Sequence, residues 1–207
     1  MLSTTTKRAV VSSSTKRLFW TYSLALLTFM FAFTTLNSAS AQSGAEKAAI
    51  RQVEALLKSA HRSSGSLGGL RSVVSRHFAV GTWTSATLGK AGKKITSGQR
   101  SQVRKLLPNY IAKQYFKQFS GSGSKAGSVV KARTVRRGVL VTSKIPSRSR
   151  TFTVVWRMRV IGGKPRVIDY VTGGVSAVVL RRSEFGGKIN QSGGAGLVKF
   201  MRQFIAS

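Results

Sequence analysis

Residues 151–160 read TFTVVWRMRV, and this stretch decides the fold class. Apolar and polar side chains alternate along it, which is typical of a β-strand with one covered face. The covered face would carry Phe152, Val154, Trp156, Met158 and Val160. A sheet, rather than a bundle of helices, is therefore expected at the centre of the chain.

Further β-rich runs lie on both sides of this strand. They cover residues 129–135, 139–145 and 166–179, the last counting as one or two strands. Short turns near Gly138 and at Gly162-Gly163 join neighbouring runs, so the strands should pair antiparallel. Helical patterns flank the whole set. The expected fold is α+β, with an antiparallel four- to five-stranded twisted sheet covered by helices that enclose an apolar cavity.

Local signals place the helices. Ser43 with Glu46, and Thr96 with Gln99, have the spacing of a capping box and predict two helix starts. Pro108 lies inside the second helical pattern, where it removes a hydrogen bond and predicts a kink or a break. A glycine-rich gap predicts that the last helical region is divided in two.

Residues 1–41 have the three-part pattern of a secretory signal peptide. Lys7, Arg8, Lys16 and Arg17 precede an apolar run over residues 18–36. Ala39 and Ala41 then provide the small side chains that a signal peptidase reads. We expect cleavage after Ala41 and a single domain over residues 42–207. The alternative is an uncleaved membrane anchor.

The charge is extreme. The chain has 35 Lys and Arg against four Asp and Glu, a net charge of +31. Four of the basic residues and none of the acids precede residue 42, which leaves +27 on residues 42–207. Such a surface attracts polyanions. Outside the cytoplasm the available polyanions are anionic lipid headgroups rather than nucleic acid. Cysteine is absent, so the domain must fold by packing alone.

The residues that usually perform catalysis are scarce. There are two histidines, four scattered acids and no cysteine. No pair of carboxylates has a spacing suited to acid–base chemistry, and no serine lies in an elbow motif. No group of donors indicates a metal site, and no motif indicates a cofactor. We therefore expect a binding protein rather than an enzyme.

The most specific motif is residues 167–204, VIDYVTGGVSAVVLRRSEFGGKINQSGGAGLVKFMRQF. A strand ends in an aspartate, continues through Gly-Val-Ser, and leads into a helix with Arg-x-x-Phe and then Gly-Gly. These elements are Asp169, Gly174, Val175, Ser176, Arg182, Phe185, Gly193 and Gly194. The stretch resembles the MlaC, or toluene-tolerance auxiliary, family of periplasmic phospholipid-binding proteins. Its Arg-Arg-Ser-Glu-Phe form is most similar to the branch associated with hopanoid-containing bacteria.

The resemblance continues upstream in residues 77–107, through Phe78, Leu88-Gly89 and Gln99-Arg100. This part departs from the family pattern. Ala79 stands where the family often has aspartate, and Gly92 stands where a tryptophan usually falls. Such changes would alter the lining of a pocket.

The resemblance implies that the covered face of the sheet holds lipid acyl chains. The lining would come from the sheet and from the helix around Pro108. The candidates are Phe152, Val154, Trp156, Met158, Val171, Val175, Leu107, Tyr110 and Phe116. The resemblance alone singles out Val175 as facing the tails. An apolar stripe of this kind is, by itself, more typical of a solid core.

The other motif residues are expected to have structural roles. Asp169 would accept hydrogen bonds at a strand end, with Gly174, Ser176 and Phe185 shaping the adjoining turn and helix. For Arg182 two roles stay open, because it would either pair with a carboxylate or guide a headgroup.

The implied function is a monomeric periplasmic carrier that shuttles phospholipid. Its implied partners are an inner-membrane ABC-type transporter with a substrate-binding ring and an outer-membrane lipoprotein complex. One rival is an extracytoplasmic module that binds a polyanion or lipopolysaccharide without transferring lipid. A membrane-anchored structural protein and a lipid hydrolase are the other rivals.

Overall fold

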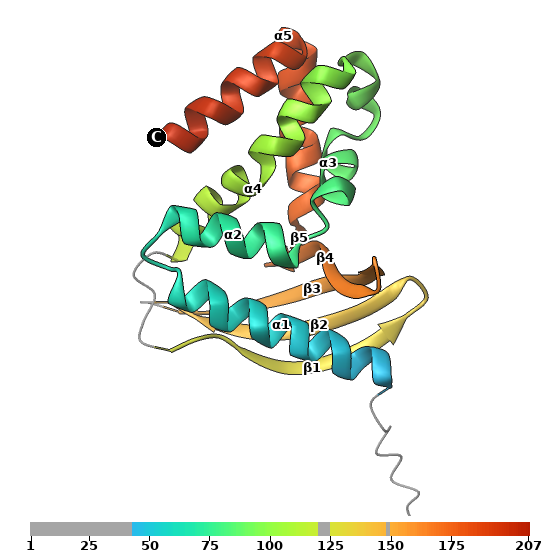
Figure 1. The fold of residues 1–207 in the computed structure, drawn as a ribbon, viewed down its shortest axis with the longest axis vertical. Coiled ribbons are helices and arrows are strands. Elements are labelled where there is room, and N and C mark those ends of the chain that lie inside the picture. Colours follow the sequence, from blue (N-terminus) through green and yellow to red (C-terminus); the bar gives the residue numbers. More distant parts are fainter. Residues whose placement is uncertain (1–42, 120–124, 148–149) are drawn as a thin grey trace, which may run out of the picture. The chain divides into compact units, whose positions relative to one another are not determined.

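A computed structural model describes residues 43–119, 125–147 and 150–207 (Figure 1). All of them belong to one unit, Gln42–Ser207. The predicted signal peptide, with its cleavage residues Ala39 and Ala41, lies outside the described residues. Within the described ranges, no helix combines the length and the apolar character needed to cross a bilayer.

The sheet confirms the predicted α+β fold. Its five strands pair antiparallel in chain order. They are β1 (Ser128–Val135), β2 (Gly138–Pro146), β3 (Thr151–Ile161), β4 (Lys164–Thr172) and β5 (Val175–Ser176). The prediction of strand as far as Val179 was wrong, because a helix begins at Ala177. Ser176 caps this helix by accepting a hydrogen bond from the Val179 N–H at 3.1 Å.

A β-bulge changes which side chains of β4 face the helices. Trp156 pairs with Tyr170 and Met158 pairs with Val167, which leaves Ile168 as the extra residue. On the far side of the bulge, Tyr170 therefore shares the covered face with Trp156. Val171 turns to the opposite face.

The helices cover one face of the sheet (Figure 1). They are α1 (Gly44–Arg62), α2 (Leu67–His77), α3 (Val80–Leu88), the short 3₁₀ helix η1 (Gly89–Lys94), α4 (Ser97–Phe119) and α5 (Ala177–Ala206). α1 runs along the strands, α2 lies above α1, and α3 to α5 rise away from the sheet. The helix α3 was not predicted, because its sequence VGTWTSATL has no helical apolar period and no side-chain cap.

Both capping pairs start a helix as predicted. Thr96 and Gln99 bond each other reciprocally, at 3.1 Å and 3.0 Å. Ser43 accepts from the Glu46 N–H at 3.2 Å. The carboxylate of Glu46 does not close the box. It accepts instead from the backbone N–H and the hydroxyl of Thr134 on β1, at 2.6 and 2.8 Å. This contact ties the start of α1 to the sheet.

Two helices test the predicted interruptions. α4 continues through Pro108 as one helical span, so of the two predicted outcomes, a kink or a break, the break was wrong. In α5, Ser192 and Gly193 leave helical geometry, with φ of +66° at Gly193. The predicted division of the last helical region is therefore confirmed, and Figure 1 shows the chain turning back there.

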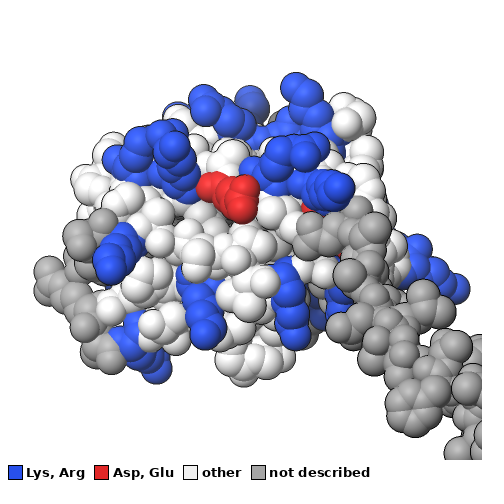
Figure 2. Space-filling view, turned by 90° about the horizontal axis from the view of Figure 1, so that it is seen from below, with Lys and Arg blue, Asp and Glu red and all other residues white. Residues whose placement is uncertain are grey.

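The basic residues are spread over the surface. Figure 2 shows one face with Lys and Arg side chains around most of it and few carboxylates. Within the described part of the chain only two ion pairs form, Arg157 with Asp169 and Arg181 with Glu184. Most cations there thus lack a carboxylate partner.

Candidate ligand-binding pocket

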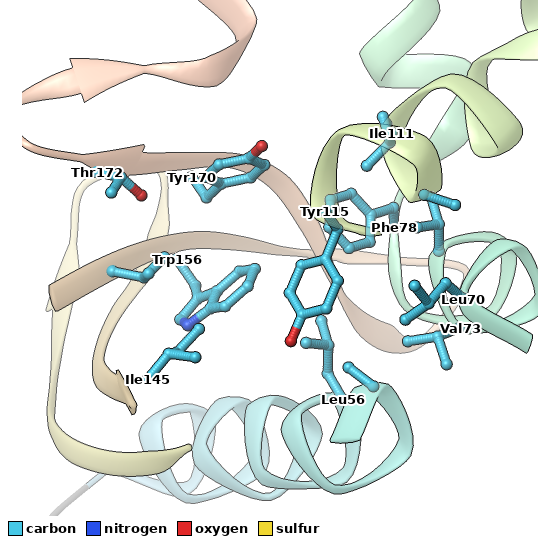
Figure 3. Close-up of a pocket in the computed structure, with 14 residues that line it drawn as sticks. Leu56, Leu70, Val73, Phe78, Ile111, Tyr115, Ile145, Trp156, Tyr170 and Thr172 are labelled. Atoms are coloured by element: carbon cyan, nitrogen blue, oxygen red, sulfur yellow. The ribbon is translucent and has the colours of Figure 1, made fainter. Parts of the chain in front are cut away.

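An apolar pocket lies between the helices and the covered face of the sheet (Figure 3). The sheet contributes Ile145, Val154, Trp156, Tyr170 and Thr172. Phe78 and the helices α1, α2 and α4 form the opposite wall, with Leu56, Ala60, Leu70, Val73, Val74, Ile111, Ala112 and Tyr115. The lining is therefore almost entirely hydrocarbon and aromatic.

The lining residues that are partly exposed to solvent indicate where the pocket opens. Tyr115, Tyr170 and Thr172 are the partly exposed lining residues, and the others are buried. These three also carry the hydroxyl groups of the lining. Burial raises the pKa of Tyr115 to about 12 and raises the pKa of Tyr170, so both phenols are neutral near pH 7. We call this partly exposed part of the lining the mouth: its hydroxyls are uncharged, and the buried remainder of the lining is apolar.

Aromatic rings close the deep end. The ring of Phe78 lies 5.5 Å from that of Trp83 and 6.5 Å from that of Trp156, centroid to centroid. The Trp156 indole N–H donates to the Ser143 hydroxyl at 2.8 Å, and the Trp83 indole N–H donates to the Val167 carbonyl at 3.2 Å. Because these indole groups already have partners, the deep wall offers an entering ligand no free donor.

The pocket is narrow. The volume of its cavity is about 40 Å³. Ligand pockets commonly hold roughly 300–1,000 Å³. An elongated apolar ligand therefore requires the helices and the sheet to separate. The three α4 residues in the lining, Ile111, Ala112 and Tyr115, all follow Pro108, where the helix lacks one backbone hydrogen bond.

Comparison with known proteins identifies the family. A sequence model described as MlaC protein matches residues 47–203. The chain belongs to the MlaC family. No curated protein matches the chain significantly. The hopanoid-associated branch stays a prediction.

A solved structure has the same fold as this MlaC-family chain. It is a phospholipid-binding protein from Ralstonia solanacearum, determined in complex with a phospholipid. The two chains are 16% identical, with a TM-score of 0.65, and the match covers 76% of this chain and 97% of the other.

The structure brings only part of the predicted lining to the pocket of this MlaC domain. Val154 and Trp156 line it. Phe152 is partly buried on the same strand and lies outside the lining. Met158 is buried at the other end of β3, where it lines a separate groove between α1 and the sheet. The predicted stripe on β3 therefore extends beyond this pocket at both ends.

The predicted residues of α4 face a different neighbour. Leu107 and Tyr110 are fully buried, and the Tyr110 ring lies 5.4 Å from that of Phe185 on α5. Phe116 is partly buried and also outside the lining. Ile111 and Tyr115 lie one and five positions beyond Tyr110, on a different face of the helix. This face points to the sheet, so these two residues reach the pocket instead.

Val171 and Val175 do not line the pocket either. The β4 bulge turns Val171 away from the covered face. Val175 is 53% exposed. It pairs with Thr172 across the β4–β5 ladder, so it lies just outside the mouth, next to a lining residue.

The remaining motif residues hold the junction of β4, β5 and α5. The Asp169 carboxylate accepts from Arg157 at 3.0 Å, from the Ser176 hydroxyl at 2.6 Å and from the Val178 N–H at 3.1 Å. Gly174, with φ of +78°, forms the turn before β5, where a side chain would be strained. Phe185 is fully buried.

Arg182 has a contact that neither sequence alternative included. Its Nε donates to the Ala86 carbonyl of α3 at 2.8 Å. This hydrogen bond joins α5 to α3 and involves no carboxylate.

Sequence reasoning missed most of the helical wall. Leu56 and Ala60 lie on the apolar stripe of α1, and Leu70 and Val74 lie on that of α2. Periodicity shows that these faces are buried. It carries no signal that distinguishes the wall of a pocket from a filled core.

Proposed function

We propose that this MlaC-family chain is a phospholipid carrier that holds acyl chains in the pocket between α1, α2, α4 and the sheet. The observation that carries the proposal is the form of the pocket, which is apolar in depth and lined with neutral hydroxyls at its mouth. An amphipathic ligand with tails and a polar head matches that division.

The energetics favour tails over a soluble ligand. Each CH₂ group withdrawn from water contributes about 0.8 kcal/mol. The lining has no charged side chain that would have to lose its hydration shell. The Ralstonia solanacearum protein, whose fold is shared, was determined with a phospholipid, which supports this ligand class.

Loading requires the pocket to widen from its present volume. We assign this movement to the part of α4 that follows Pro108, because all the α4 lining residues lie there. A proline inside a helix is a usual site of bending.

The carrier role completes the proposal. The protein would be exported by residues 1–41 and would act in the periplasm. There it would exchange lipid with an inner-membrane ABC-type transporter and an outer-membrane lipoprotein complex. No bond is made or broken in this process. The positive net charge would favour contact with anionic lipid headgroups.

A pair of alanine substitutions on α1 tests the pocket. Ala60 is buried in the lining, whereas Ala55 is exposed on the same helix. Ala60→Leu fills space that the tails would use, and Ala55→Leu adds the same atoms to the surface. We expect the purified Ala60→Leu protein to carry several-fold less phospholipid, by organic extraction and mass spectrometry, with wild-type lipid in Ala55→Leu.

The controls decide between functions. Both variants should unfold cooperatively. Ala55→Leu should stay close to the wild type in stability, whereas Ala60→Leu, a small-to-large change at a buried position of a narrow pocket, should cost about 1–3 kcal/mol. Equal lipid content in both variants would remove the pocket from the proposal. A folded wild-type protein that stays empty after incubation with vesicles would instead favour the polyanion-binding alternative.

A further inference from the structure

The end of the sheet away from the pocket mouth has an exposed apolar tip. Val160 is 62% exposed and Ile161 is 37% exposed, although both belong to β3. Successive residues of a strand point to opposite faces, so the tip is apolar on both sides. A contiguous exposed apolar patch with a polar rim is typical of an interaction site.

Two hairpin turns meet at this tip. The β3–β4 turn is Gly162-Gly163, with φ of +57° and +74°, as in the tight turns that two glycines allow. The β1–β2 turn leads into Gly138, where an added Cβ would lie 2.0 Å from the Met158 carbonyl oxygen. The glycine thus lets this turn press against β3. Arg137, Gly138, Arg159 and Val160 line one shallow hollow.

The apolar tip is surrounded by cations. Arg136, Arg137, Arg159 and Lys164 are all exposed. Within the described residues none of them forms an ion pair, since the two pairs found there use other arginines. We call these four residues together with Val160 and Ile161 the hairpin-tip surface.

We propose that the hairpin-tip surface docks on an anionic lipid bilayer. The valine and isoleucine side chains would enter the headgroup region, and the arginines and the lysine would contact lipid phosphates. Long basic side chains suit this depth, because their stems are apolar while their charged heads reach the phosphate layer. The docking proposal uses no residue of the pocket and stands independently of the proposed cargo.

The position of this surface explains how docking leaves the pocket accessible. β3 runs from Val154, in the pocket lining, to Ile161 at the tip. At 3.3 Å per residue, these positions are about 23 Å apart. A carrier held at its tip would therefore keep the mouth outside the docked surface.

Because the chain has no cysteine, an introduced cysteine can be labelled at a single position. A single cysteine is introduced as Val160→Cys or, as the matched control, as Val130→Cys on β1. Val130 is also a valine, it is 53% exposed, and it lies near the start of β1, at the opposite end of that strand from the β1–β2 turn. Each protein is labelled with the environment-sensitive dye NBD and mixed with phosphatidylglycerol–phosphatidylethanolamine vesicles or with phosphatidylcholine vesicles.

We expect a blue shift and a rise in emission at position 160 with the phosphatidylglycerol vesicles only. Position 130 should respond weakly. The same response at both positions, or a response at position 130 alone, would overturn the assignment of the docking surface. No response at either position would overturn membrane docking altogether.

Charge variants provide the second readout. Arg136→Gln combined with Arg137→Gln should weaken vesicle binding by about tenfold or more, because both charges would lie at the lipid surface. Arg71→Gln combined with Arg202→Gln removes two exposed arginines elsewhere and should weaken it much less. Equal losses would mean that only the net charge matters. Extracted phospholipid should be unchanged in both, so a failure of the docking proposal is seen separately from a failure of the carrier proposal.

Discussion

α4 takes part in two apolar regions that differ in how completely they are filled. On one side, the Tyr110 ring contacts Phe185, Phe200 and Phe204 on α5, with centroids 5.4, 6.2 and 4.7 Å away. Its hydroxyl donates to Glu184 at 2.8 Å and accepts from Arg181 at 3.2 Å. On the other side, the same helix faces a pocket with partly exposed lining residues at its mouth.

The difference between these two sides of α4 shows that apolar composition alone does not distinguish a filled core from a binding pocket. Both regions are built from aromatic and branched side chains. The α4–α5 region is filled by complementary rings, which favours one fixed arrangement. The pocket side keeps space next to the segment of α4 beyond Pro108. We therefore expect the two regions to respond differently to the same chemical change.

The largest expected effect is on the filled side. Phe185→Ala should lower the free energy of unfolding by about 3–5 kcal/mol, because it leaves a cavity among packed rings. Phe78→Ala, on the pocket wall, should cost less, since Phe78 borders existing space and loses fewer contacts. Urea unfolding followed by circular dichroism measures both. Equal losses would mean that the pocket side is as tightly filled as the α4–α5 side.

Low pH should lower the stability of the protein mainly through His77, which precedes the pocket residue Phe78. His77, at the end of α2, is buried, and its Nδ1 accepts from Gln52 at 3.1 Å. Its Nε2 has no partner among the described residues. Burial, with the charges of Arg76 and Arg166, lowers the pKa of His77 from 6.5 to about 4. The unfolded chain thus takes up a proton at higher pH than the folded one.

The sign of the effect follows from this difference. Stability from neutral His77 is complete above pH 6.5 and is lost as the pH falls from 6.5 to about 4. The loss should be about 2–3 kcal/mol. His77→Gln should remove this part of the pH dependence in urea unfolding at pH 7, 5.5 and 4.5. An unchanged pH profile in His77→Gln would exclude His77 as its source.

The smallest expected effect concerns Pro108. Pro108→Ala restores the backbone N–H at this position of α4 and with it one helical hydrogen bond, which should stabilise the protein by about 1 kcal/mol. It should also slow the exchange of labelled phospholipid with vesicles severalfold, because the pocket-lining end would bend less readily. Faster or unchanged exchange with greater stability would locate the opening movement elsewhere.

Much of the fold was predictable because local signals agreed. The alternation in residues 151–160 and the glycine turns predicted the antiparallel sheet, and the Thr96–Gln99 pair predicted the start of α4. The sequence contains no signal for the β-bulge at the extra residue Ile168. Its bulge reversed the faces of β4, so Tyr170 and Thr172 took the place that was expected for Val171.

The site was less predictable for a different reason. The alternation of β3 identified Val154 and Trp156 correctly as facing the helices. Which of those covered residues border space depends on contacts between elements distant in the chain. Met158 and Tyr110 are as buried as residues that line this pocket, and only the tertiary arrangement places them elsewhere.

The measurement that tests the carrier proposal most directly is quenching of Trp156 by phospholipid with brominated acyl chains. Trp83→Phe leaves Trp156 as the only tryptophan in residues 42–207, and Trp156→Phe leaves the deeper Trp83. We predict strong quenching of Trp156 on loading with brominated lipid, weaker quenching of Trp83, and none with the unbrominated lipid. Stoichiometric lipid binding that leaves Trp156 emission unchanged would contradict the assignment of this pocket to the acyl chains.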